Sequence, residues 1–210
     1  WCLVFGVWCL VFGVSALRMN SAARSAKEDL RRSVRDALKA MSPEERLKTS
    51  VEATKLLVAQ RRWTEAQSVL FYAPMERELD IWPLLKTALE SGKHACLPRF
   101  DPTTRRYVAC QIKDPKTDLE SGQFRIREPG GWCASMPLIK LDFILVPGVA
   151  FDLRGRRLGR GKGHYDRLLA ATRGTTCGVA FDEQIVREVP VEPHDVLLNC
   201  ILTPTRWIEV

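Results

Sequence analysis

The sequence predicts an α/β protein with an open, mostly parallel sheet covered by helices on both faces, a Rossmann-like three-layer arrangement with an edge hairpin. Short apolar, β-prone runs alternate along the chain with amphipathic helical patterns. At 210 residues and 46% hydrophobic content, the chain is long enough for one core and too short for two large ones. We therefore expect a single domain over residues 20–210.

The first nineteen residues stand apart from this pattern. They contain a tandem copy, WCLVFGV at 1–7 and again at 8–14, and the first charged residue is Arg18. A signal peptide has a basic start and a membrane span needs about 20 apolar residues, so the segment falls short of both. We expect residues 1–19 to be a non-native or disordered extension, with Met19 as the functional start; the alternative is a membrane or import segment.

Two helices are expected at the start of the domain. Residues 20–40 carry apolar side chains at helical spacing, and Lys27 and Arg31 share an adjacent stripe because they lie four residues apart. Ser42, Pro43 and Glu45 predict the start of a second helix, because they form a capping-box pattern with proline at the first helical position.

The remaining elements follow in α/β order. Strands are expected at 69–72, 94–98, 107–112, 142–147, 176–181 and 200–203, with 94–98 and 107–112 paired as the edge hairpin. Asp80 is expected to cap a helix that Gly92 closes. Residues 113–140 are expected to form a long surface connection whose only strand-like piece is 124–126.

The most informative stretch runs from Asp142 to Leu169. Gly159, Gly161 and Gly163 occupy every second position, and Arg160 and Lys162 lie between them. Glycine lets backbone amides approach a ligand closely, and the following helix start adds partial positive charge, so the stretch favours an anion such as phosphate. The spacing fits neither the Rossmann glycine pattern nor a Walker A loop.

Charge and cysteine content narrow the function further. The 32 basic and 25 acidic residues give a formal charge of +7, which favours an anionic partner such as a nucleotide or a nucleic acid. The seven cysteines form no CxxC pair, so neither a disulfide framework nor a zinc site is indicated. Asp166, just beyond the glycines, offers a carboxylate for magnesium.

Several motifs together resemble one known family. One set of residues resembles the signature of the 5-formyltetrahydrofolate cyclo-ligases, also called methenyltetrahydrofolate synthetases: Phe151-Asp152, Gly155, Arg157-Leu158-Gly159, Gly161, Gly163 and Tyr165-Asp166. Further matching motifs lie in the same order at 41–46, 97–99, 126–129 and 145–152, within a resemblance that extends from about Lys27 to Thr203.

This resemblance implies an ATP- and Mg²⁺-dependent conversion of 5-formyltetrahydrofolate to 5,10-methenyltetrahydrofolate, with release of ADP and phosphate. It implies that Arg157, Lys162, His164 and Tyr165 are catalytic, that Asp166 and Asp195 bind the metal, and that Met75, Glu78 and Tyr165 bind the folate. The implied ATP-binding residues are Lys27, Arg31, Arg157, Leu158, Gly159, Arg160, Gly161, Lys162, Gly163, His164 and Tyr165. The expected partner is a reduced folate, which can be polyglutamylated, and a cytoplasmic monomer is expected, with a mitochondrial location as the alternative.

The chain departs from the family pattern in three places. His164 replaces an aromatic residue that is most often tyrosine, and Ile81 follows Asp80 where threonine is common. The basic residues Arg160 and Lys162 occur in only part of the family. Two other functional classes stay open from the residues alone: another nucleotide-dependent enzyme, such as a kinase or dehydrogenase, and a nucleic-acid-binding module suggested by the basic charge.

Overall fold

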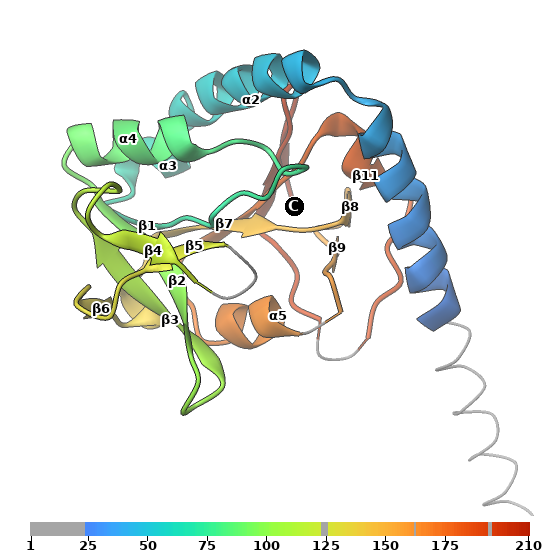
Figure 1. Ribbon diagram of the computed structural model, residues 1–210. Coiled ribbons are helices and arrows are strands. Elements are labelled where there is room, and N and C mark those ends of the chain that lie inside the picture. Colours follow the sequence, from blue (N-terminus) through green and yellow to red (C-terminus); the bar gives the residue numbers. More distant parts are fainter. Residues whose placement is uncertain (1–23, 123–125, 162, 193–194) are drawn as a thin grey trace, which may run out of the picture.

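The computed structural model describes residues 24–122, 126–161, 163–192 and 195–210 (Figure 1). The predicted extension at 1–19 and the predicted site residue Lys162 lie outside the described residues. Residues 24–40 are helical, and they continue into a chain of helices and short strands that surround one large sheet.

The helices that follow the first one are α2 (Pro43–Val58), α3 (Arg61–Glu65), α4 (Trp82–Glu90) and α5 (His164–Leu169), with 3₁₀ turns η2 (Leu138–Lys140) and η3 (Asp182–Gln184). The strands are β1 (Ser68–Leu70), β2 (His94–Asp101), β3 (Arg106–Ile112), β4 (Leu119–Ser121), β5 (Arg127–Pro129), β6 (Ser135–Met136), β7 (Phe143–Pro147), β8 (Ala150–Asp152), β9 (Arg157–Leu158), β10 (Thr175–Val179), β11 (Ile185–Val186), β12 (Cys200–Leu202) and β13 (Trp207–Glu209).

The large sheet has the strand order β13-β12-β10-β7-β1-β2-β3-β6. Strands β12, β10, β7, β1 and β2 run parallel, whereas β13, β3 and β6 are antiparallel to their neighbours. The chain order of the parallel strands reverses between β1 and β7, since β2 lies on one side of β1 and the later strands lie on the other. In doubly wound sheets the crevice outside the carboxyl ends of strands at such a reversal is the usual ligand site.

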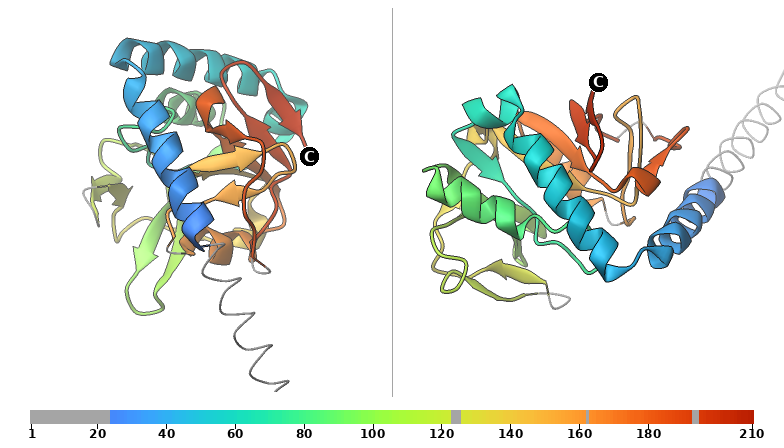
Figure 2. Two further views of the ribbon diagram at one scale, coloured as in Figure 1. Left: turned by 90° about the vertical axis from the view of Figure 1, so that its right-hand side faces the viewer. Right: turned by 90° about the horizontal axis from the view of Figure 1, so that it is seen from above.

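Helices cover both faces of the sheet, as the sequence predicts (Figures 1 and 2). Along β1, Val69 packs with the first helix, α2, α3 and α4, whereas Leu70 packs on the opposite face with Leu168 and Leu169 of α5. This alternation follows from the two-residue period of a strand. Because both faces of β7 and β12 are buried, these two strands are apolar, which explains why their sequences read as short continuous runs.

Two local signals predicted from the sequence are confirmed: the capping box at the start of α2 and the glycine after the end of α4. The Ser42 hydroxyl accepts a hydrogen bond from the backbone N–H of Glu45, and the Glu45 carboxylate accepts one from the N–H of Ser42, which completes the capping box of α2. The prediction that Asp80 caps α4 is wrong in position, because Ile81 occupies the N-cap; the Asp80 carboxylate instead accepts from the N–H of Trp82 at 2.9 Å, in a turn just before the helix. Gly92, beyond the end of α4, has a φ of +78°.

The connection at 113–140 is more structured than the sequence predicted. It contains the antiparallel pair β4–β5 and the edge strand β6, which pairs with β3 outside the predicted hairpin. The strand-like piece predicted at 124–126 lies largely outside the described residues. A second small sheet, β11-β8-β9, was also missed because each of its strands is only two or three residues long.

Within residues 24–122, 126–161, 163–192 and 195–210, no helix is long and apolar enough to cross a membrane.

Candidate active site

A cleft of about 820 Å³ opens at the carboxyl ends of β1 and β7, where the strand order reverses. Tyr72 and Ala73 follow β1 at this edge, and Pro147 and Gly148 lie at the end of β7. The other described residues that line the cleft are Arg24, Lys27, Glu28, Arg31, Met75, Glu78, Pro98, Tyr107, Ile126, Arg127, Glu128, Arg157, Leu158, Gly159, Arg160, Gly161, Gly163, His164, Tyr165, Asp166, Glu192 and Asp195.

The glycine loop connects β9 to α5 along one wall of the cleft. Gly161 and Gly163 have φ values of +94° and +62°, a region that favours glycine over residues with a Cβ, and Gly163 occupies the N-cap position of α5. A Cβ at Gly159 would lie 2.9 Å from the Arg157 guanidinium. The alternating glycines therefore allow the turn and leave room for Arg157. Since α5 has only six residues, the positive potential of this wall comes mainly from side chains.

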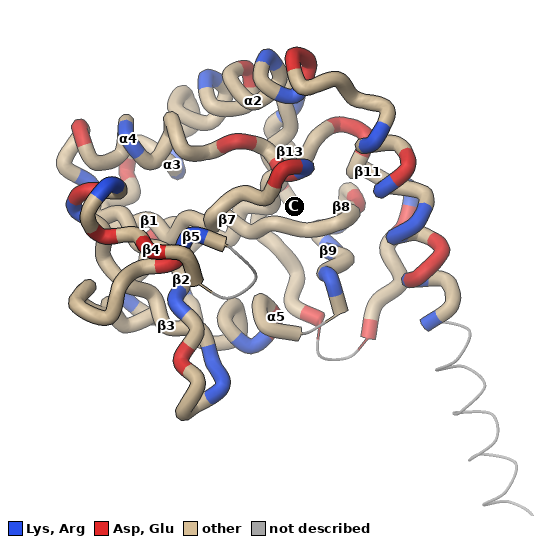
Figure 3. Tube along the Cα trace, viewed as in Figure 1, with Lys and Arg blue, Asp and Glu red and all other residues tan. Residues whose placement is uncertain are grey.

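The first helix forms the facing wall. Its Lys27 ammonium lies 2.7 Å from a Glu192 carboxylate oxygen and 3.3 Å from one of Asp195. One turn further on, Arg31 Nε donates to the carbonyl of Gly159 at 3.0 Å. Figure 3 shows basic segments along this helix and at β9, with acidic segments beside them. The predicted basic stripe thus faces the glycine loop.

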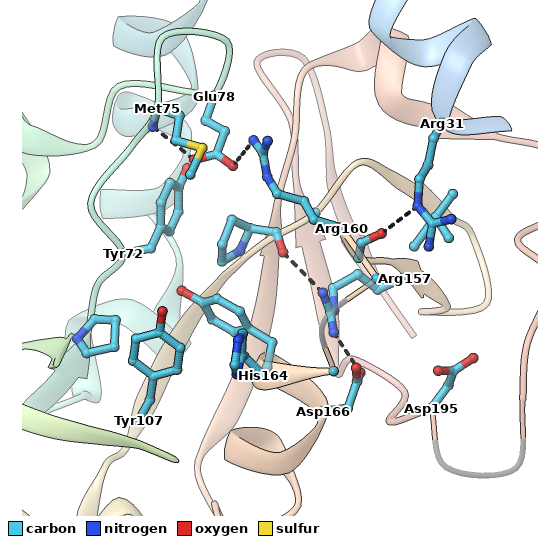
Figure 4. A pocket seen from close by; sticks show the side chains of 18 of the residues that line it. Arg31, Tyr72, Met75, Glu78, Tyr107, Arg157, Arg160, His164, Asp166 and Asp195 are labelled. Carbon is cyan, nitrogen blue, oxygen red and sulfur yellow. Dashed lines mark hydrogen bonds and ion pairs between the residues drawn. The ribbon is translucent and has the colours of Figure 1, made fainter. Parts of the chain in front are cut away.

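Opposite charges pair inside the cleft (Figure 4). Arg157 Nη2 lies 2.7 Å from Asp166 Oδ1, and the Arg157 side chain is only 4% exposed. Arg160 Nη2 lies 2.8 Å from Glu78 Oε1, and the other oxygen of Glu78 accepts from the N–H of Met75 at 3.0 Å. Carboxylates of the cleft therefore offset the charges of Lys27, Arg157 and Arg160.

The middle of the cleft is aromatic. The Arg157 guanidinium lies 5.7 Å from the centre of the Tyr165 ring, a cation–π arrangement. His164 meets Tyr107 and Phe100 of the hairpin edge to face, with ring centres 5.3 and 5.9 Å apart. Its Nδ1 lies 3.0 Å from the Arg167 guanidinium. His164, which departs from the family pattern, thus still makes edge-to-face contacts with two aromatic rings.

Three tyrosines around this region stay neutral near pH 7. Burial raises the pKa of Tyr72 well above its usual value, and the Glu78 carboxylate raises it further. Burial, followed by Glu78, also raises the pKa of Tyr165, and burial followed by Glu128 raises that of Tyr107. Their hydroxyls are therefore proton donors to hydrogen bonds rather than phenolates.

The two predicted metal ligands, Asp166 and Asp195, both line the cleft. Each already contacts a cation, Arg157 and Lys27 respectively. Across the described ranges no cluster of three or more His, Cys, Asp or Glu side chains could hold a metal by itself. Because Mg²⁺ takes one or two carboxylates and completes its shell with water and substrate phosphates, this pair fits an ion that binds together with a nucleotide.

The structure brings the predicted residues together. Every described member of the predicted site lines the one cleft, although the members come from four separated parts of the chain. Sequence reasoning assigned no role to Tyr72, Pro98, Tyr107, Arg127 or Glu128. Residues 126–129 had been noted only as a matching motif, and Tyr107 carries no local signal, because the pairing of β3 with β2 is what brings it to the cleft.

The fold and the site define a class of protein: a doubly wound α/β protein with a cleft lined by paired charges at the point where the strand order of the sheet reverses. Comparison with known proteins identifies the family. Residues 23–204 match the model of the 5-formyltetrahydrofolate cyclo-ligase family. The chain therefore belongs to this family of enzymes, as the motifs predicted.

Individual relatives agree with this assignment. A 5-formyltetrahydrofolate cyclo-ligase of Mus musculus is 30% identical over 189 residues, which cover 85% of this chain and 93% of the relative. A cyclo-ligase of Mycolicibacterium smegmatis is 37% identical over 147 residues, covering 68% and 76%. The solved 5,10-methenyltetrahydrofolate synthetase of Aquifex aeolicus has a TM-score of 0.79 at 32% identity and covers 87% of this chain and 92% of its own.

Proposed function

We propose that the cleft binds ATP with Mg²⁺ beside 5-formyltetrahydrofolate and converts them to 5,10-methenyltetrahydrofolate, ADP and phosphate. The observation that carries the proposal is that Met75 and Glu78 line the same cleft as the basic glycine loop. Two ligands can therefore meet in one cavity, whose volume lies in the upper part of the roughly 300–1,000 Å³ usual for ligand sites.

The two ends of the cleft differ in chemistry. The end formed by the first helix and the glycine loop carries Lys27, Arg31, Arg157 and Arg160, which suit a triphosphate. The end formed by the loop after β1, the hairpin and β5 is lined by Tyr72, Met75, Pro98, Tyr107 and Ile126, which suit a flat, largely apolar ring system. Lys162, between two glycines of the loop, is proposed to join the triphosphate group.

In the proposed reaction the formyl oxygen attacks the γ-phosphorus of ATP, and the bond to the ADP oxygen breaks. The neighbouring folate amine then adds to the activated carbon, loses its proton and closes the ring, and the carbon–oxygen bond to phosphate breaks. No protein nucleophile is needed, so catalysis comes from positioning and charge stabilisation. Arg157, His164 and Tyr165 line the junction between the two ends, where the formyl group must meet the phosphate.

Asp166 and Asp195 are the residues proposed to hold Mg²⁺, since both line the nucleotide end. When bound, Mg²⁺ offsets negative charge on the phosphate oxygens. Arg157 and Lys27 must then exchange part of their contact with these carboxylates for contact with phosphate, which keeps the total charge of the site balanced.

The test is a turnover assay with 5-formyltetrahydrofolate, ATP and Mg²⁺, each omitted in turn, followed by the near-ultraviolet absorbance of the methenyl product. Product is expected only when all three are present, together with one ADP and one phosphate per turnover. Product formed without ATP or without added Mg²⁺ after chelation would contradict the proposal. A parallel reaction with NADH in place of ATP addresses the dehydrogenase alternative. The monomeric state and the cytoplasmic location stay predictions.

A further inference from the structure

One ion pair crosses the cleft from the folate end to the nucleotide end. Arg160, in the glycine loop, and Glu78, in the loop after β1, are 82 positions apart in sequence, and their side chains meet at 2.8 Å (Figure 4). The Glu78 side chain is 10% exposed, whereas that of Arg160 is 57% exposed. The carboxylate is thus held inside the cleft, and the arginine reaches in from its rim.

The environment of Glu78 leaves it dependent on this arginine. One carboxylate oxygen accepts from the backbone N–H of Met75, and the other is bonded to Arg160. Among the described residues, Arg160 is the cation within salt-bridge distance of Glu78. The side chains beside it, Tyr72 and Tyr165, are neutral phenols. A largely buried carboxylate that loses its cation is destabilised until another donor replaces it.

The two partners face different ligands under the proposed function, on which this inference rests. Arg160 lies between glycines of the loop that suits the triphosphate, and its guanidinium, which makes one contact with Glu78, can bind two phosphate oxygens at once. Glu78 faces the folate end, and a reduced pterin carries ring N–H and amino groups that can donate to a carboxylate.

We propose that the Arg160–Glu78 pair couples the two substrates, so that nucleotide binding withdraws Arg160 from Glu78 and thereby strengthens folate binding at the exposed carboxylate. Because linkage between binding equilibria is reciprocal, folate binding strengthens nucleotide binding by the same factor. The pair then acts as a positioning device: each substrate prepares the cleft for the other, and the site is fully complementary only when both are present.

The size of the coupling follows from the exposure of the pair. Breaking an exposed ion pair costs little, whereas removing one partner of a desolvated pair costs several-fold more, because a buried charge is left uncompensated. With Glu78 largely buried and Arg160 more than half exposed, we expect a coupling near the lower end of the usual range, about fivefold in dissociation constant.

The experiment measures the Kd of 5-formyltetrahydrofolate by calorimetry, with and without a non-hydrolysable ATP analogue and Mg²⁺. In the unmodified protein the analogue is expected to lower this Kd about fivefold. In Arg160→Gln the folate is expected to bind about fivefold more tightly without nucleotide, because Glu78 is already available, and the analogue is expected to add little. Tighter folate binding in this variant is diagnostic. If Arg160 only contacted the folate, its replacement would weaken folate binding or leave it unchanged.

A second variant tests the reciprocal effect, that of Glu78 on nucleotide binding. Glu78→Gln frees Arg160, so the analogue is expected to bind more tightly to this variant in the absence of folate, and the dependence of one Kd on the other ligand is expected to disappear. If Arg160→Gln does not fold, this arm still decides the question.

Arg156→Gln is the matched control. Arg156 forms a pair of similar length, 2.9 Å, with Glu188, and neither residue lines the cleft. Unmodified coupling is expected in this variant.

The proposal is overturned if Arg160→Gln retains the full nucleotide effect, or if its nucleotide-free folate affinity is unchanged. Failure of the proposed function has a different signature, because the unmodified protein would then bind neither folate nor the ATP analogue, or would bind both without turnover.

Discussion

Replacing Asp166 by asparagine tests both the stability and the chemistry of the cleft. The Asp166 carboxylate lies 2.7 Å from the Arg157 guanidinium, whose side chain is 4% exposed, while that of Asp166 is 20% exposed. Asn keeps an oxygen that can accept the hydrogen bond but removes the charge. A hydrogen bond between charged groups contributes about 1.5–3 kcal/mol and a neutral one about 0.5–1.5 kcal/mol, so we expect Asp166→Asn to lower the free energy of unfolding by about 1–2 kcal/mol.

Arg157 has few alternatives once this charge is removed. Its Nε is already buried without a hydrogen-bond partner, and its Nη1 reaches the carbonyl of Pro147 only at 3.5 Å. Arg157 therefore has no nearby acceptor among the described residues that could replace the Asp166 carboxylate and reduce the loss of stability. Urea denaturation of the variant and the unmodified protein, compared at equal m-values, measures the difference. Asp36→Asn is the matched control, because its pair with Lys39 is exposed, and it is expected to cost less than about 0.5 kcal/mol.

The same variant removes a carboxylate proposed to hold Mg²⁺. We expect turnover at saturating substrates to fall at least about tenfold, which corresponds to about 1.4 kcal/mol of transition-state stabilisation, and the Mg²⁺ concentration for half-maximal rate to rise. Methenyl product absorbance measures both quantities. Unmodified turnover across the whole Mg²⁺ titration would refute the metal role, and a stability change below about 0.3 kcal/mol would refute the role of the ion pair.

Three further predictions concern stability. Ser42→Ala removes one half of the capping box and is expected to destabilise the protein by about 1 kcal/mol in urea denaturation; a change within the error of the measurement would mean that α2 does not depend on this cap. Gly178→Ala places a methyl group 2.8 Å from the Phe151 ring and is expected to cost about 1–3 kcal/mol, whereas Gly131→Ala, which meets no atom within 4 Å, is expected to change stability little. Burial raises the pKa of Cys96 from 9.0 to about 12, so the unfolded chain loses this proton first, and stability is expected to fall as pH rises from about 9 towards 12. Cys96→Ala should reduce that slope by up to about 1.4 kcal/mol per pH unit, and an unaltered slope would show that this thiol does not contribute.

Much of the fold could be predicted because its signals are local. The apolar runs of β1, β7, β10 and β12 are buried on both faces, so their composition alone marks them as strands. Ser42 and Asp80 act on N–H groups two or three residues away, and such contacts leave a recognisable spacing. The strands β8, β9 and β11 are only two or three residues long, too short to show a period of their own, and they were missed.

The residues of the candidate site also fall into two groups: those that sequence spacing could predict and those that it could not. The alternating glycines, Arg157 and Asp166 lie within one short stretch and could be found by their spacing. Tyr107 and Glu128 could not, because the first reaches the cleft only through the pairing of β3 with β2, and the second only through the packing of β5 beside β2.

By itself, the sequence determined the α/β class, the capping box of α2, the positions of the alternating glycines and the family to which the chain belongs. Only the tertiary structure decided how the charged residues pair: Lys27 with Glu192 and Asp195, Arg157 with Asp166, and Arg160 with Glu78. The physical reason is that an ion pair depends on distance in space and on burial. Sequence spacing encodes neither for Lys27 and Arg160, whose partners lie 82 or more positions away. In the structure, the arginines of the loop that the sequence predicts to bind phosphate are paired with carboxylates, Arg157 with Asp166 and Arg160 with Glu78.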